Sequence, residues 1–88
     1  MTSRRPSQRD VLTALQHLCA EQHFGYAPGR ASAEGVLNAI AIGGFGRGTP
    51  VRAAVREHLE ALVAAGQARK VDVMSPTGEP MHGWFEPV

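Results

Sequence analysis

The chain has 88 residues and a formal net charge of +1; 43% of its residues are hydrophobic and 19% are charged. This length and balance are typical of one small globular domain and exclude a disordered segment. The densest apolar stretch, residues 36–42, is far shorter than the roughly 18 residues that span a membrane, and the single cysteine, Cys19, excludes an internal disulfide. We therefore expect a cytoplasmic protein of a bacterium or a phage, with no membrane partner.

Charge is distributed unevenly along the chain. Residues 1–56 contain seven arginines and three acidic residues, a net charge of +4, whereas residues 57–88 contain two basic and five acidic residues, a net charge of −3. A chain polarised in this way can present one basic surface while its total charge stays near zero. Eight of the nine basic residues are arginine, which suits phosphates and base edges, although a GC-rich genome would produce the same bias.

The first predicted element is a helix from about Gln8 to Gln22, preceded by a flexible N-terminal arm of residues 1–7. Ser7 is a plausible N-cap, and Asp10 follows at the spacing of a capping box. Apolar residues recur at helical spacing and form one broad stripe: Val11, Leu12, Leu15, Leu18 and Cys19. The arm is followed by a single folded domain over residues 8–88.

A second helix is predicted from about Ala33 to Ile42. The segment HFGYAPGRAS, residues 23–32, precedes it as a loop with a very short extended piece around Ala31, and Ser32 is the expected N-cap. The sequence GGFGRG follows at residues 43–48. It lacks the ending of a Walker A motif and follows a helix, so we interpret it as a flexible loop with Phe45 in the core.

The third helix has the strongest signals. Thr49 and Pro50 are predicted as its N-cap and first residue, and Gly66 as the residue just past its end. Arg52 and Arg56 flank the apolar face, and two glutamates lie on the opposite side. The apolar face consists of Val51, Val55, Leu59 and Leu62.

The C-terminal residues predict a two-stranded hairpin. Residues 68–74 alternate, with Val71 and Val73 on one side, and residues 81–86 form the return strand after the loop SPTGEP. Trp84 and Phe85 point to opposite faces, and we expect one of them to pack on the helices. The expected core consists of Val11, Leu15, Leu18, Val36, Ile40, Val55, Leu59, Leu62 and Val71.

The order of three helices and a hairpin resembles a winged helix-turn-helix domain over about residues 8–87. The residues that carry the resemblance are Thr49-Pro50-Val51-Arg52, then Leu59, Leu62 and Gly66, then the hairpin ending at Trp84-Phe85. The resemblance implies an α+β fold, a three-helix winged helix-turn-helix with a C-terminal two-stranded wing. In such domains the third helix usually enters the DNA major groove, and the wing contacts the backbone or the minor groove. Two features depart from the pattern: Gln67-Ala68 follows the glycine, and the loop before the third helix has seven residues.

The candidate DNA-binding residues lie around the third helix and at the start of the hairpin. They are Arg47, Thr49, Arg52, Arg56, Arg69 and Lys70. Arginines one turn apart at the start of a recognition helix reach base edges or phosphates. The alternative is a solvated flank in which Arg56 pairs with Glu60.

No residue pattern predicts catalysis or a cofactor. His17, Cys19 and His23 lack the further ligands that a metal site requires, and Cys19 lies on the apolar stripe. The first hypothesis is therefore a DNA-binding protein that is not an enzyme, a transcriptional regulator acting on double-stranded DNA as a homodimer. The alternative is a protein-interaction module, such as a phage-encoded inhibitor or a component of a larger complex. The near-neutral charge and the acidic residues of the third helix favour that alternative.

Overall fold

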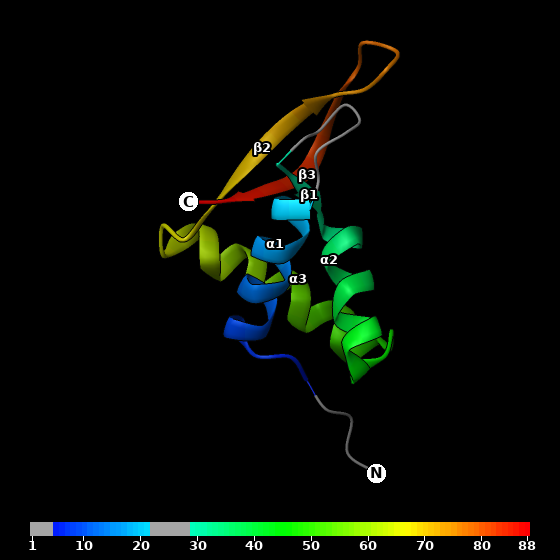
Figure 1. The fold of residues 1–88 in the computed structure, drawn as a ribbon, viewed down its shortest axis with the longest axis vertical. Coiled ribbons are helices and arrows are strands. Elements are labelled where there is room, and N and C mark those ends of the chain that lie inside the picture. The colour runs from blue at the N-terminus through cyan, green and yellow to red at the C-terminus, as the bar shows by residue number, and fades with distance from the viewer. Residues whose placement is uncertain (1–4, 22–28) are drawn as a thin grey trace.

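The computed structural model describes residues 5–21 and 29–88. The fold is α+β, with three helices packed together and an antiparallel sheet whose hairpin extends away from them (Figure 1). The elements in chain order are α1 (Gln8–Glu21), β1 (Ala31–Ser32), α2 (Ala33–Ile40), a π-helical turn (Ala41–Phe45), α3 (Thr49–Ala64), β2 (Ala68–Met74) and β3 (Pro80–Pro87).

Helix α1 begins with the predicted capping box. The Asp10 amide donates to Ser7 Oγ at 3.1 Å, and the Ser7 amide donates to Asp10 Oδ2 at 2.8 Å. The two residues thus satisfy amide groups that the helix itself cannot pair. One face of α1 is buried through Val11, Leu15 and Cys19. Residues 1–4 of the predicted arm lie outside the described residues.

Helix α2 is shorter than predicted. Ser32 caps it as expected, because its hydroxyl accepts a hydrogen bond from the Gly35 amide. The helix ends at Ile40, and the chain then widens into a π-helical turn through Phe45, in which Gly44 has a φ of 104°. Part of the predicted loop is therefore a wider continuation of the helix. Phe45 packs against the core, as expected.

Helix α3 begins at Thr49, one residue earlier than predicted. Gly48, not Thr49, is the N-cap, and Thr49 and Pro50 are its first helical residues. The end of the helix is as predicted: Gly66 has a φ of 75°, its amide bonds to Val63 O, and the next amide bonds to Leu62 O. This is a Schellman motif, which favours glycine because other residues are strained at positive φ.

The sheet has three strands, so the expectation of a two-stranded hairpin was incomplete. Its order is β1-β3-β2, and both strand pairs are antiparallel. The extended piece expected around Ala31 is strand β1, which pairs with Phe85 of β3. The pairing of β2 and β3 shifts between Val71 and Val73, where Gly83 of β3 has a φ of 80°.

The side of β2 that faces the helices differs from the prediction. Lys70 lies opposite Phe85, and Val71 lies opposite Trp84. Residues directly opposite each other share a face of the sheet. Phe85 belongs to the helical core, which confirms that one of the two aromatic residues packs on the helices. Val71 is therefore on the far face with Trp84 and is only half-buried.

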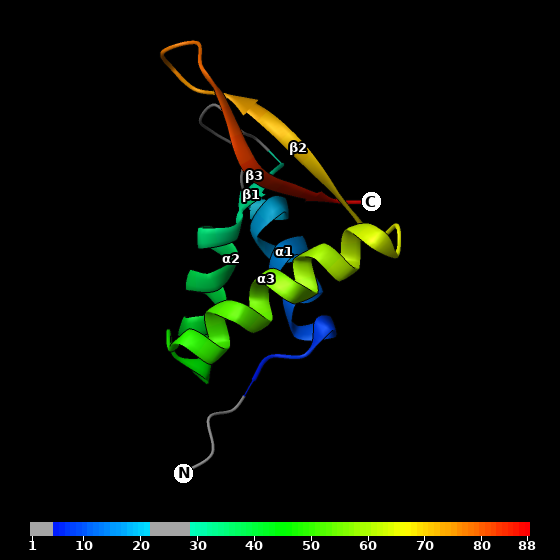
Figure 2. The same ribbon diagram turned by 180° about the vertical axis from the view of Figure 1, so that it is seen from behind.

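The core lies between the three helices and the helix-facing side of the sheet. Figure 2 shows α3 crossing in front of α1, with α2 beside both. Leu18 packs against this core but is only partly buried, unlike the other predicted helical members. The buried cluster comprises Val11, Leu15, Cys19, Ala31, Val36, Leu37, Ile40, Val51, Val55, Leu59, Leu62, Ala68 and Phe85. Of the helices in the described part of the chain, none has the length and apolar character to cross a membrane.

Candidate nucleic-acid interface

The first two turns of α3 present a basic surface. Thr49, Arg52, Ala53 and Arg56 line one open hollow of about 240 Å³, and all four residues are exposed. The small side chain of Ala53 leaves this hollow between the two arginines. The structure thus brings together three of the predicted site residues.

The backbone at the start of α3 also favours negative ligands. Gly48 provides no side-chain hydrogen bond to the helix, and the first turn of this fully described helix contains no acidic residue. By contrast, Asp10 and Glu34 lie in the first turns of α1 and α2. Unpaired amides and the helix dipole at such an end attract anions.

Helix α2 holds two of the predicted arginines. Arg52 Nη1 lies 2.9 Å from Glu34 Oε1, and Arg47 Nη1 donates to Asn38 Oδ1. Glu34 and Asn38 are four residues apart and therefore neighbours on one side of α2. Arg47 and Arg52 therefore contact the same side of α2, Arg47 from the loop before α3 and Arg52 from α3 itself.

Arg56 is the arginine of this surface that has no partner in the part of the chain that the structure describes. It forms no hydrogen bond or ion pair with any residue in the described ranges. It also borders a second hollow of about 270 Å³ between α3 and β3, which Leu59, Glu60 and Phe85 line as well. Arg56 therefore lies where the two hollows adjoin.

The second half of the exposed face of α3 is acidic. Glu57 and Glu60 are both exposed, and Glu60 Oε1 lies 2.6 Å from Lys70 Nζ on β2. The expected alternative, a pair between Arg56 and Glu60, is therefore not formed. Because carboxylates repel anions, the start of α3 is more favourable to an anionic ligand than its end.

The predicted basic residues of the hairpin are both ion-paired. Lys70 pairs with Glu60, and Arg69 Nη2 lies 3.1 Å from Glu86 Oε1. The second oxygen of Glu86 lies 3.4 Å from Arg30 Nε. One carboxylate therefore joins arginines from β2 and from the residue before β1.

The hairpin tip lies far from the basic surface. Along the longest axis, the tip and the start of α3 are toward opposite ends of the molecule (Figures 1 and 2). The tip sequence, residues 75–79, contains Glu79 and no basic residue. The candidate interface is thus built on α3 and the loop before it, with Arg69 and Lys70 at some distance near the end of α3.

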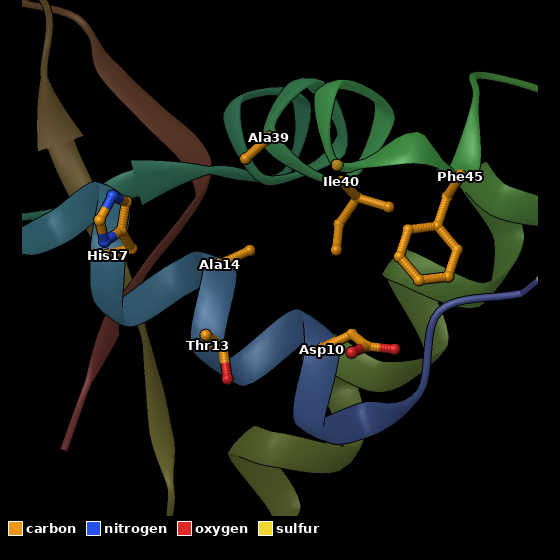
Figure 3. Close-up of a pocket in the computed structure, with 8 residues that line it drawn as sticks. Asp10, Thr13, Ala14, His17, Ala39, Ile40 and Phe45 are labelled. Carbon is orange, nitrogen blue, oxygen red and sulfur yellow. The ribbon is translucent and has the colours of Figure 1, made fainter.

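A second candidate surface lies on another side of the helices. A groove of about 300 Å³ separates α1 from α2 and the π-helical turn. Figure 3 shows Ile40 and Phe45 on one wall and Ala14 and Asp10 on the other, all directed toward the same space. The groove is therefore apolar in its centre, with one carboxyl group near its end.

The surroundings of this groove are more apolar and more acidic than the start of α3. Ile42, in the same π-helical turn, is 83% exposed. His17 of the α1 wall pairs with Glu21 at 2.9 Å. Ile42 does not itself line the groove, but an apolar groove and an exposed aliphatic side chain on one turn are typical of a protein-binding surface rather than of a nucleic-acid-binding one.

Cys19 and the histidines do not form a metal site within the residues that the structure describes. Cys19 is buried, and its Sγ lies 3.9 Å from Phe85 O. Burial, together with the negative charge of Glu86, raises the pKa of the Cys19 thiol. No three His, Cys, Asp or Glu side chains gather among residues 5–21 and 29–88, and His23 lies outside them.

Sequence reasoning missed the two residues of α2 that bind the arginines. Glu34 and Asn38 were not singled out, although their four-residue spacing on a predicted helix was a usable signal. That signal does not say which arginine each acceptor meets, since the answer depends on how α2 and α3 pack.

Comparison with known proteins gives no relative from which a function could be inferred, so functional inference depends on the geometry of α3 and of the groove. No protein-family model matches the chain, and no curated protein and no solved structure matches it with significance.

Proposed function

We propose that this chain is a winged-helix DNA-binding protein that contacts double-stranded DNA through the start of α3. The observation that carries the proposal is the exposed hollow lined by Thr49, Arg52, Ala53 and Arg56. It combines two arginines with an uncapped helix N-terminus, and both features suit a phosphate backbone and the base edges of a major groove.

The arrangement of elements supports the winged-helix part of the proposal. The strand β1 between α1 and α2, and the sheet order β1-β3-β2, fit a winged-helix-like arrangement. In that arrangement α3 is the helix that reads DNA, and its N-terminal residues face the bases. The acidic second half of α3 then limits the contact to its first two turns.

The proposal includes a homodimer that acts in the cytoplasm as a transcriptional regulator. A single module of this size offers a small interface, so specific binding requires two half-sites. The dimer is tested by sedimentation with and without duplex. A complex containing one chain per duplex at saturation would contradict it.

The test of DNA binding is a salt titration with duplex fragments. We expect the affinity to fall steeply as salt increases, because each neutralised phosphate releases counterions. Replacing both Arg52 and Arg56 with alanine should weaken binding by about 1–3 kcal/mol per arginine. Both side chains are exposed, so the variant should keep its fold by circular dichroism.

A matched control removes the same charge elsewhere. Arg9 on α1 and Arg69 on β2 are both exposed, and their double alanine variant should retain most of the affinity. Equal losses in the two double variants would indicate a diffuse charge effect. If the unchanged protein bound no duplex at low salt, the DNA-binding proposal would be wrong.

A second candidate function is protein binding through the groove between α1 and the π-helical turn. The observation that favours it is the apolar wall that Ile40 and Phe45 form on one side of the groove. A volume of about 300 Å³ is at the lower end of ligand-sized pockets and can receive one or two anchoring side chains.

A displayed library of random peptides tests this second function. We expect enrichment of peptides with an aromatic or aliphatic anchor, and loss of their binding when Ala14→Trp fills the groove. Because such binding depends on apolar anchors, it should change little with salt. Peptides that bind the filled variant equally well would rule the groove out as their site.

A further inference from the structure

Glu34 and Arg52 form a pair that changes what Arg52 can recognise. The Glu34 oxygen accepts from Nη1 of Arg52 at 2.9 Å. A guanidinium group has five N–H donors in a planar fork, so the pair leaves donors available. An ion pair also restricts the rotation of a long side chain, so the contact with Glu34 favours one direction of that fork.

Arg56 is in a different situation, although it lies only one turn further along α3. It has no hydrogen-bond or ion-pair partner among the described residues. Glu60 lines the same hollow as Arg56 but is paired with Lys70, so no ion pair among the described residues holds the Arg56 side chain in one direction. A fixed fork suits the two acceptors of a guanine edge, whereas a freely moving charge suits the DNA backbone.

We propose that Glu34 is a positioning residue that holds Arg52 as a guanine reader, while Arg56 contacts phosphate. This inference rests on the proposed DNA-binding function and names the feature of DNA that the site selects. Glu34 carries a charge that repels DNA, so it weakens binding to every sequence. It raises selectivity because Arg52 bound to Glu34 is directed toward a base edge.

The experiment uses a pool of short duplexes with a randomised centre, from which bound molecules are recovered and sequenced. The full chain should enrich guanine at one position of each half-site by at least about fivefold. Glu34→Gln should abolish most of that enrichment while binding the whole pool as tightly as the unchanged protein, or more tightly. Loss of selectivity without loss of affinity is a result that simple misfolding does not produce.

Glu57→Gln is the matched control. Glu57 is an exposed glutamate of α3 and has no ion pair with the described residues, so this variant removes the same charge without changing Arg52. It should bind the pool more tightly and keep the guanine enrichment. Similar loss of enrichment in both variants would overturn the inference, because general charge would then explain selectivity.

Arg52→Lys completes the test. It keeps the positive charge but lacks the planar fork, so it should bind the pool and lose the guanine enrichment. Adding Glu34→Gln to it should cause no further loss of selectivity, because the two residues act through one contact.

The outcomes separate this inference from the function on which it rests. An unchanged protein that binds no duplex overturns DNA binding and the inference together. DNA binding without guanine enrichment, or with enrichment that survives Glu34→Gln, overturns the inference alone and leaves the proposed function standing.

Discussion

The start of α3 and the base of the hairpin carry similar basic residues but differ in what surrounds them. At the base of the hairpin, Arg69 and Lys70 are paired with Glu86 and Glu60. At the start of α3, Arg52 is also paired, with Glu34, but Arg56 has no such partner among the described residues. Sequence counts treat these arginines as equivalent, yet their carboxylate neighbours differ.

The comparison shows that available charge, rather than total charge, distinguishes the two regions. An exposed ion pair contributes only about 0–1 kcal/mol to stability, so the pairs at the hairpin add little to the fold. They nevertheless offset the positive charge that a phosphate would meet there. We therefore expect the two regions to respond differently to the same substitutions.

The largest expected effect is a loss of stability when the buried face of α3 is altered. Leu59→Ala removes a fully buried side chain of the core and should lower the free energy of unfolding by roughly 2–5 kcal/mol. Val71→Ala at the hairpin should cost less, because Val71 is half-buried on the far face of the sheet. Urea denaturation measures both, and equal losses would contradict the assigned faces of the sheet.

The next effect is on DNA affinity. Arg56→Ala should weaken binding to any duplex by about 1–3 kcal/mol and reduce the slope of log affinity against log salt by about one. Arg69→Ala should change affinity less than twofold, since Arg69 is already paired with Glu86. Fluorescence anisotropy at several salt concentrations checks both, and a larger effect at Arg69 would reverse the comparison.

The smallest effect comes from releasing Lys70. Glu60→Gln removes the carboxylate that pairs with Lys70 and should tighten DNA binding by less than about fivefold, the range of one exposed pair. Glu57→Gln removes the same charge without releasing a lysine. The same anisotropy assay compares the two variants. A larger gain in affinity for Glu60→Gln than for Glu57→Gln would show that the ion pair keeps Lys70 from contacting DNA, and equal gains would contradict this.

Local signals predicted three helix ends correctly: the starts of α1 and α2 and the end of α3. The capping box of Ser7, the cap at Ser32 and the positive φ of Gly66 are all confirmed. Each depends on residues within a few positions of one another, so the sequence contains the whole interaction. The cap of α3 was placed one residue late because Thr49 followed by Pro50 matches the common pattern of a capping residue before a proline at the first helical position.

Non-local features were harder to predict. Alternation in β2 separates Val71 from Lys70, but it does not say which set faces the helices. Phe85 decides that question from the opposite strand. The π-helical turn was missed because its glycines normally indicate a loop.

The candidate site was predictable as a set of residues but not as an arrangement. The sequence places Arg52 and Arg56 one turn apart on α3. It does not predict that α2 supplies a carboxylate to Arg52, or that β2 takes Glu60 away from Arg56. Both outcomes depend on packing between elements that are distant in the chain.

The pairing of β1 with β3 has a consequence for the order of folding. The helices and the hairpin contain mostly local contacts, whereas Ala31 and Phe85, which pair across β1 and β3, are far apart in the sequence. Closing so long a segment costs entropy before its contacts form, so such pairings tend to form late. Substitutions at Ala31 should therefore speed unfolding and leave the folding rate almost unchanged. This two-residue strand would then determine how long the native state lasts rather than how quickly it is reached.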